Sequence, residues 1–208
     1  MSATMKAAFL QELGHLEVRE TSRPEPGPGE ALLRVRACGI CGSDLRSVRY
    51  GHHALKLPHI LGHEIAGIIA ALGKGVKDLH LGQRVALTPP VTCGQCSACL
   101  NGHPNRCPNL LAIGENLPGG FAEYVIAPAR SIVGGFLLPV PDEVSDDAAT
   151  LAEPLSCVIN GQELLNLGMG DTVVVLGLGP VGCMHVALAR HRGASKIIAS
   201  DVSPERLQ

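Results

Sequence analysis

The sequence predicts a mixed fold, with an all-β unit over residues 1–145 followed by an α/β unit over residues 146–208. In the first unit, short apolar runs separated by Gly and Pro recur at short intervals, a pattern typical of a barrel-like β domain. The second unit carries an apolar run, a helical stretch and another apolar run, in that order. A length of 208 residues allows one large domain or two modest ones.

Several short strands are expected in the first unit. The clearest is Glu30–Ala37, where apolar and charged residues alternate as they do in a half-buried strand. A Pro/Gly cluster at Pro24–Gly29 predicts a turn before it. The other expected strands are Met5–Leu10, His15–Glu20, Glu64–Leu72, Arg84–Leu87 and Phe121–Ala127.

The second unit is expected to begin with a helix. Ser145 is a typical N-cap residue, and the acidic residues Asp146 and Asp147 would face the positive end of the helix dipole. Pro154 should break or restart this helix because it has no N–H to donate. The elements expected next are a strand at Asp171–Leu176, a helix at Pro180–Arg192, a strand at Lys196–Ser200 and a helix opened by Ser203-Pro204-Glu205.

The composition argues against several classes of protein. Lys and Arg number 17 against 19 Asp and Glu, and there are only five aromatic residues, so a nucleic-acid binder is disfavoured. No apolar run approaches the roughly 18 residues of a membrane span, and no signal peptide is visible at the N-terminus. We therefore expect a cytoplasmic protein, whose eight cysteines are metal ligands or buried thiols rather than disulfides.

Four cysteines form a compact C-x2-C-x2-C-x7-C cluster interleaved with Gly and Pro. Four thiolates so close in sequence can surround one tetrahedral Zn²⁺ and leave no open position, which predicts a structural metal site. A zinc ribbon that binds nucleic acid is a weaker alternative, because few basic residues lie nearby. The cluster consists of Cys93, Cys96, Cys99 and Cys107.

A second set of potential ligands is dispersed along the chain. It comprises Cys41 within Cys38-Gly-Ile-Cys-Gly-Ser-Asp44, His63 and Glu64 after Gly62, and Glu153 before Pro154. A thiolate, an imidazole and a carboxylate together suit a catalytic zinc that keeps one position for water or substrate. Taken alone, each residue is better explained without a metal, Cys41 as a buried thiol, His63 as a core imidazole and Glu153 as a solvated helix acid; only their combination points to a metal site.

These segments resemble the zinc-dependent medium-chain alcohol and polyol dehydrogenases. The pattern Gly62-His63-Glu64-x2-Gly67-x5-Gly73-x2-Val76 fits the zinc signature of that family, and the two cysteine-containing segments match as well. The resemblance implies a GroES-like catalytic domain over 1–145, with a structural zinc lobe at 91–111. For 146–208 it implies connecting helices and the first βαβ part of a Rossmann domain, which is a doubly wound α/β fold.

The same resemblance suggests roles for individual residues. It implies that Cys41, His63 and Glu64 surround the catalytic Zn²⁺ and that the four-cysteine cluster holds the structural one. The stretch Glu153–Ser156 is similar to the sorbitol and threonine dehydrogenase branch, where a glutamate replaces a cysteine ligand. Whether Glu64 or Glu153 contacts the metal directly stays open. Cys38, Cys157 and Cys183 match no ligand position and are expected to be buried packing residues.

Proton transfer is also suggested by the resemblance, with Ser43 taking the proton from the alcohol. Many members of the family extend this relay with a histidine five residues after the ligand cysteine. That position holds Arg46 here, so the proton would leave through His52 or His53, the cofactor ribose or water.

A glycine-rich loop predicts a dinucleotide site. The segment Gly177-Leu178-Gly179-Pro180-Val181-Gly182 follows an apolar strand and opens a helix, which is the context that the G-x-G-x-x-G motif requires. Helix N–H groups at this point can bind a pyrophosphate. Asp201 ends the next strand, where a carboxylate favours the ribose hydroxyl of NAD over the phosphate of NADP. The nearby Arg206 leaves room for NADP.

The expected activity is oxidation of a secondary alcohol or polyol to a ketone, with zinc as Lewis acid and NAD as hydride acceptor. Only two strands of a nucleotide-binding sheet that has about six are present, so a truncated chain or one part of a longer enzyme is expected. The alternatives are a zinc-binding fragment without activity and a zinc-ribbon interaction module. The expected partners are a small-molecule alcohol and further copies of the chain in a homo-oligomer, a dimer or tetramer.

Overall fold

The computed structural model describes residues 3–53 and 55–207. The chain divides into two compact units, Met1–Leu151 and Ala152–Gln208. Helix α4 (Asp146–Thr150), with which the second unit was expected to begin, belongs to the first of these units. Among the described residues, no helix combines the length and the apolar character that crossing a membrane requires.

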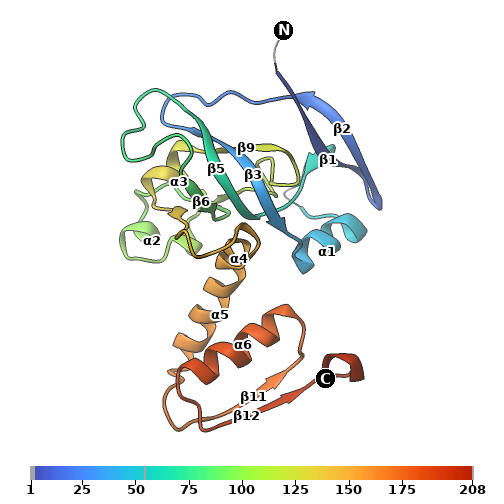
Figure 1. Ribbon diagram of the computed structural model, residues 1–208, viewed down its shortest axis with the longest axis vertical. Helices are drawn as coiled ribbons and strands as arrows, with labels where there is room; N and C mark the ends of the chain where they lie inside the picture. The colour runs from blue at the N-terminus through green and yellow to red at the C-terminus, as the bar shows by residue number, and fades with distance from the viewer. Residues whose placement is uncertain (1–2, 54, 208) are drawn as a thin grey trace. The chain divides into compact units, whose positions relative to one another are not determined.

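The first unit is built from antiparallel sheets (Figure 1). A five-stranded sheet has the order β10-β6-β5-β3-β9, and a three-stranded sheet has the order β2-β1-β4. A bridge between Ala7 and Ala122 links the first strand to the segment before β9. The strands are β1 (Thr4–Glu12), β2 (His15–Ser22), β3 (Ala31–Gly39), β4 (His59–Ile60), β5 (Glu64–Leu72), β6 (Arg84–Leu87), β9 (Tyr124–Ala127) and β10 (Leu137–Pro139).

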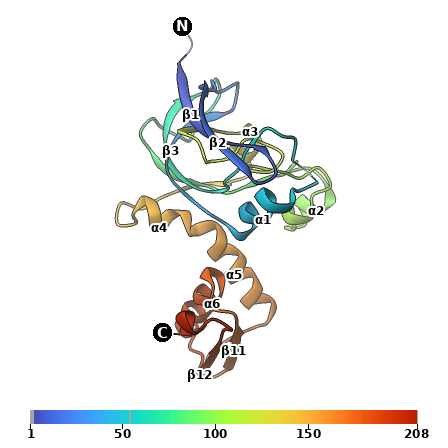
Figure 2. The same ribbon diagram turned by 90° about the vertical axis from the view of Figure 1, so that its right-hand side faces the viewer.

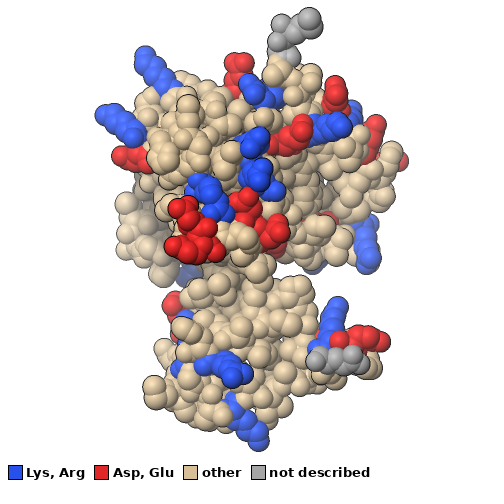
Figure 3. All heavy atoms as spheres, in the orientation of Figure 1, with Lys and Arg blue, Asp and Glu red and all other residues tan. Residues whose placement is uncertain are grey.

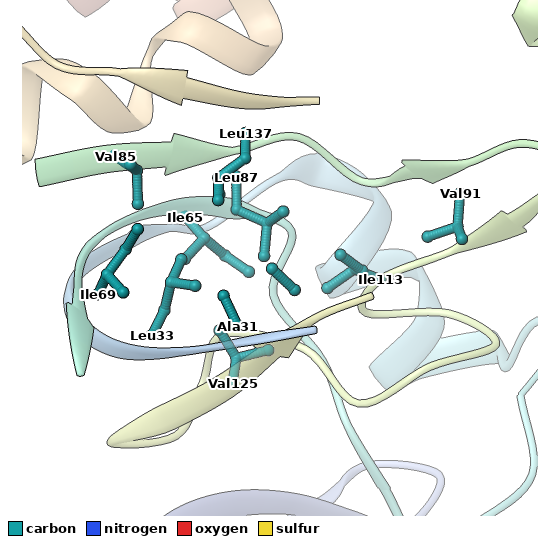
Figure 4. Close-up of a cluster of buried hydrophobic side chains, with 11 residues drawn as sticks. Ala31, Leu33, Ile65, Ile69, Val85, Leu87, Val91, Ile113, Val125 and Leu137 are labelled. Atoms are coloured by element: carbon teal, nitrogen blue, oxygen red, sulfur yellow. The ribbon is translucent and has the colours of Figure 1, made fainter. Parts of the chain in front are cut away.

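The core lies between the strands of the five-stranded sheet (Figure 4). Leu33 from β3, Ile65 and Ile69 from β5 and Val85 from β6 point toward one another there and are almost completely buried. Burial of side chains of this size stabilises the fold by about 1.5–3 kcal/mol each, before the entropic costs of folding. The packed sheet gives the loops at the ends of its strands a rigid base.

The register of β3 and β5 determines where the first candidate site forms. The two strands are antiparallel, and Gly39 at the end of β3 pairs with Glu64 at the start of β5. Cys41 follows the first of these strands and His63 precedes the second. Residues separated by more than twenty positions in the sequence are thereby brought to one end of the sheet.

Helix α4 is attached to the sheet by an ion-pair cluster. Asp146 accepts hydrogen bonds from Arg84 Nε at 3.2 Å and Nη2 at 3.0 Å, and from Arg36 Nε at 3.2 Å. Basic and acidic side chains lie side by side on this surface (Figure 3). Ser145 caps the helix by accepting a hydrogen bond from the Ala148 N–H at 3.1 Å, which confirms the predicted start.

The second unit is a βαβ arrangement with one preceding helix (Figure 2). Strands β11 and β12 pair in parallel, from Thr172 beside Lys196 to Leu176 beside Ser200. Gln162 donates to the carbonyl of His185 at 2.8 Å and thereby joins the two helices. The elements are α5 (Ala152–Leu164), β11 (Thr172–Leu176), α6 (Pro180–His191), β12 (Lys196–Ser200) and the 3-10 helix η2 (Pro204–Leu207).

The predicted mixed β then α/β architecture is confirmed, and the structure differs in detail. Helix α1 (Gly42–Tyr50) was not predicted. The helix is interrupted between α4 and α5, as expected near Pro154. This proline lies in the first turn of α5, where a missing N–H costs little. Cys157 and Cys183 are exposed in this chain, so the expectation that they are buried packing residues was wrong for both. Cys38 does pack against the core.

Candidate functional site

The first candidate site is built around the start of α1. Cys41 is the N-cap residue of this helix, with an extended backbone at φ −85° and ψ 156°. Its N–H donates to Asp44 Oδ2 at 2.9 Å, and its carbonyl accepts from the Asp44 N–H at 3.1 Å. This reciprocal pairing between the N-cap and the third helical residue satisfies groups that a helix start otherwise leaves unpaired. Asp44 therefore fixes the orientation of Cys41.

Asp44 also contacts the segment that carries His63. Its Oδ1 accepts a hydrogen bond from the Gly62 N–H at 3.3 Å and lies 3.6 Å from Nδ1 of His63. The Asp44 side chain is 4% exposed and that of His63 is 13% exposed. A buried carboxylate beside one ring nitrogen holds the imidazole in place and leaves its other nitrogen available for a metal.

Glu64 places its carboxylate against the backbone of the paired strand. The residue is 7% exposed. A Cβ at Gly39 would lie 1.9 Å from Glu64 Oε2, so the carboxylate occupies space that any other residue at position 39 would fill. The glycine is therefore required for the close approach of β3 and the Glu64 side chain.

These elements bring three potential metal ligands together. One atom each of Cys41, His63 and Glu64 lies within 4.8 Å of the others. Sulfur, nitrogen and oxygen donors in this combination suit Zn²⁺, and the partial exposure of Cys41 leaves the group accessible from solvent. The donor set and its spacing therefore fit a zinc ion that keeps an open position.

Burial and neighbouring charges perturb two groups at this site. Burial alone lowers the pKa of His63, but the hydrogen bond and charge of Asp44, together with Cys41, raise it to about 9. Burial, reinforced by the charge of Asp44, raises the pKa of Cys38 to about 12. A thiol with so high a pKa stays protonated at neutral pH, so Cys38 is a buried neutral thiol.

The remaining predicted residues of this site lie in different places. Ser43 is exposed in the first turn of α1, two residues after Cys41. Glu153 lies in the first turn of α5, within the second unit, where its Oε1 is 3.9 Å from the thiol of Cys157. The structure thus brings Cys41, His63 and Glu64 together within the first unit, whereas Glu153 belongs to the second.

The four-cysteine cluster forms a closed lobe. Strands β7 (Pro90–Val91) and β8 (Leu111–Ala112) pair at its base, and helix α2 (Ser97–Leu100) and the 3-10 helix η1 (Pro104–Arg106) lie between them. The four sulfur atoms all lie within 4.8 Å of one another. Two of the separations, Cys96 to Cys99 and Cys93 to Cys107, are 3.5 Å.

These sulfur separations fit a metal better than disulfides. A disulfide needs about 2.05 Å between its sulfurs, whereas four ligands at about 2.3 Å from a tetrahedral zinc stand about 3.8 Å apart. None of the eight cysteines, each of which is among the described residues, forms a disulfide. Backbone N–H groups of Gln95 and Cys96 lower the pKa of Cys93 to about 6, whereas burial and the neighbouring Cys99 thiol raise that of Cys96 to about 11.

The glycine-rich loop has the geometry of an anion site. Gly177 has φ +98° at the end of β11, a conformation that favours glycine. Gly179 is the N-cap of α6, and Pro180 takes the first helical position. A Cβ at Gly182 would lie 1.9 Å from the carbonyl oxygen of Gly177. The helix start, with the half-exposed Val181 in its first turn, can therefore approach the loop closely.

Asp201 joins this loop to the end of β12. Its Oδ2 accepts from the Leu178 N–H at 2.6 Å and its Oδ1 from the Ser203 N–H at 2.8 Å. These two hydrogen bonds, with Arg206 at 3.5 Å, lower the pKa of the carboxyl. An ionised carboxylate at this point can accept from a ribose hydroxyl, and Arg206 partly offsets its charge.

Asp44 is the functional residue that the sequence-based prediction missed. Within the Cys38–Asp44 segment, the sequence pattern alone assigns it no role of its own. The signal was available, because an acid three residues after a potential N-cap is the spacing of a capping box. Its contact with His63 depends on the fold and is not visible in the sequence.

Comparison with known proteins adds independent evidence. The family model of the alcohol dehydrogenase GroES-like domain matches residues 27–142. A sorbitol dehydrogenase of Bacillus subtilis (strain 168) is 38% identical, and the match covers 98% of this chain and 58% of that protein. An L-threonine 3-dehydrogenase of Deinococcus radiodurans is 35% identical with the same coverage. The chain thus spans about three fifths of the length of these relatives.

Solved structures of dehydrogenases are also similar to this chain. A proposed zinc-binding dehydrogenase of Sinorhizobium meliloti 1021, solved bound to NADP, superposes with a TM-score of 0.90 at 38% sequence identity. The match covers 99% of this chain and 58% of that one. It therefore extends over both units of the present structure.

Proposed function

Because this chain belongs to the family of the alcohol dehydrogenase GroES-like domain, we propose that it forms the zinc-binding part of a dehydrogenase. The proposed reaction oxidises a secondary alcohol or polyol to a ketone and transfers the hydride to NAD. The observation that carries the proposal is the convergence of Cys41, His63 and Glu64 donor atoms within 4.8 Å of one another. The relatives named as sorbitol and threonine dehydrogenases support the substrate class.

Cys41 and His63 are the proposed protein ligands of the catalytic zinc. Glu64 and Glu153 are the two candidate carboxylates, and the burial of Glu64 beside the other two donors supports the first of them. Zinc would supply the Lewis acidity that lowers the pKa of the alcohol hydroxyl. Asp44 orients both Cys41 and His63 through its two carboxylate oxygens.

Ser43 is the proposed proton acceptor. It is exposed in the first turn of α1, only two residues after Cys41, so its hydroxyl can accept the substrate proton and donate its own toward solvent. The exposure of this turn means that His52 and His53 are not needed for proton exit, although their rings are 4.2 Å apart in the loop after α1.

The loop from Gly177 to Gly182 is the proposed pyrophosphate site. Glycine at both ends of the turn and the free N–H groups at the start of α6 support an anion there. Asp201 is proposed to accept from the ribose and to favour NAD. The choice between NAD and NADP needs a direct test, because Arg206 lies beside the Asp201 carboxylate and a similar solved structure is bound to NADP.

A second zinc is proposed in the four-cysteine lobe, where four thiolates would leave no position open for substrate. That zinc would hold the lobe together without contributing to the reaction. A cytoplasmic location and a homo-oligomer stay part of the proposal.

The test combines metal analysis with turnover. Purified protein should contain two zinc ions per chain and produce NADH, followed at 340 nm, when a secondary alcohol or polyol is added with NAD. Cys41→Ser should reduce the zinc content to about one and abolish turnover. Cys183→Ser, which removes an exposed thiol, should leave the zinc content at two. Two zinc ions without turnover would support the alternative of a zinc-binding chain that is inactive by itself.

A further inference from the structure

Positive charge is concentrated in the segment that begins beside Cys41. Between Gly42 and His63 the sequence contains Arg46, Arg49 and Lys56 but only one acidic residue, Asp44. The whole sequence carries a net charge of −2, so this segment is more positive than the rest of the chain. Blue side chains project from the region of α1 in Figure 3.

Two of these cations face the same depression. A hollow of about 530 Å³ lies along α1 and is lined by Gly42, Leu45, Arg46, Arg49 and Tyr50. These positions repeat every three or four residues, as residues on one helix face do. With a rise of about 1.5 Å per residue, Arg46 and Arg49 lie about 7.5 Å and about 12 Å along the helix axis from Cys41.

Neither guanidinium has a carboxylate partner among the described residues. Within the described part of the chain, no carboxylate forms an ion pair with Arg46 or Arg49, and both residues are exposed. Asp44, the nearest acid in sequence, is buried and already accepts from Cys41 and Gly62. Two like charges three residues apart on a helix repel each other, and a bound anion would relieve this repulsion.

We propose that this face of α1 binds the phosphate or carboxylate of an anionic alcohol substrate. The inference rests on the proposed function only in treating the ligand as the substrate. Arg46 and Arg49 present planar groups that can donate two parallel hydrogen bonds to either anion. The short distance from Cys41 suits a polyol chain that has a reacting hydroxyl near its middle and an anionic group at one end.

Calorimetric titration of the zinc-loaded protein tests the proposal without requiring turnover. The probes are sorbitol 6-phosphate and gluconate, with sorbitol as the neutral counterpart of both. At least one anionic probe should bind at least tenfold more tightly than sorbitol. The double substitution Arg46→Ala with Arg49→Ala should remove that advantage and leave sorbitol binding within about twofold, because a charge-assisted contact is worth roughly a factor of ten or more.

The matched control removes two cations elsewhere. Lys74→Ala with Lys77→Ala changes the net charge equally in an exposed loop of the same unit and should leave the advantage intact. Equal binding of all three probes overturns the proposal. It is also overturned if the double arginine variant loses affinity for NAD while its binding of the anionic probes is unchanged, because the anion would then be the dinucleotide phosphate.

Failure of the proposed function gives a different result. If no alcohol yields NADH but the arginine-dependent advantage persists in the titration, the anion site is retained and the dehydrogenase assignment falls. Conversely, turnover of neutral and anionic alcohols with equal kcat/KM, unaffected by the arginine substitutions, retains the dehydrogenase and removes the anion site.

Discussion

Asp44 Oδ1 lies 3.6 Å from Nδ1 of His63, and both side chains are largely buried. The other oxygen of the same carboxylate accepts the Cys41 N–H at 2.9 Å. A single acid thus orients two of the three converging ligands, one of which follows β3 while the other precedes β5 at the same end of the sheet. The site is therefore preorganised by the fold before any metal binds.

Replacing Asp44 should weaken one metal site selectively. In Asp44→Ala the imidazole of His63 loses its charged neighbour and the Cys41 N–H loses its acceptor, so zinc affinity at this site should fall about 10–100-fold. Competition with a chelator, followed by metal analysis, should show one zinc lost early and the other retained.

The control for this change is an acid without such contacts. Asp78→Ala alters an exposed loop residue and should leave both zinc affinities unchanged. Retention of both zinc ions in Asp44→Ala at chelator concentrations that leave the wild type intact would contradict the positioning role.

Some features of this site were readable in the sequence and others were not. The four cysteines and the glycine loop are local in sequence, so their spacing alone indicated what they form. Helix α1 was missed because its buried residues are Asp44 and Ser47, which give no apolar periodicity. It is specified by the pairing of Cys41 with Asp44 rather than by hydrophobic burial.

Long-range relationships were the least predictable. The pairing of Gly39 with Glu64 depends on the register of two distant strands, which no local pattern reports. Glu153 was included among the ligands through a resemblance, and its place in the second unit leaves that role as a proposal. The exposure of Cys157 and Cys183 could not be inferred, because a lone cysteine carries no signal of which face it occupies.

The four-cysteine lobe should depend on its metal. In Cys99→Ser the zinc loses one of four thiolates, so the zinc content should fall by one and the segment between β7 and β8 should become sensitive to protease. That segment has little apolar burial of its own, because its buried residues are the polar Thr92 and the metal-ligand candidate Cys107. Limited proteolysis with mass spectrometry would locate the cuts. Unchanged zinc content would argue against a metal in the lobe.

The ion-pair cluster at α4 should make the free energy of unfolding depend on pH. Hydrogen bonds from Arg84, with Arg36, lower the pKa of Asp146 below its usual 3.8. The stabilisation is therefore fully present above about pH 4 and is lost as the pH falls through the lowered value. Asp146→Asn should reduce the free energy of unfolding by about 1 kcal/mol at neutral pH, and this difference should shrink below pH 4.

Urea denaturation at several pH values measures this difference. Asp142→Asn, an exposed acid on the same connecting segment, serves as control and should show no comparable change. A difference between wild type and Asp146→Asn that stays constant from pH 7 to pH 3 would show that the carboxylate charge is not the stabilising element.

Gly182→Ala should disrupt the glycine-rich loop. The added methyl group would lie 1.9 Å from the carbonyl oxygen of Gly177, so the start of α6 must move away from the turn. The cost in unfolding free energy should be about 1–3 kcal/mol, and NAD binding, measured by calorimetry, should weaken because the helix N–H groups leave the anion position.

Gly168→Ala is the matched control, since a Cβ there meets nothing within 4 Å, and its effect should stay within about 0.5 kcal/mol. If both substitutions left NAD affinity unchanged, the close approach of Gly182 to Gly177 would serve packing alone.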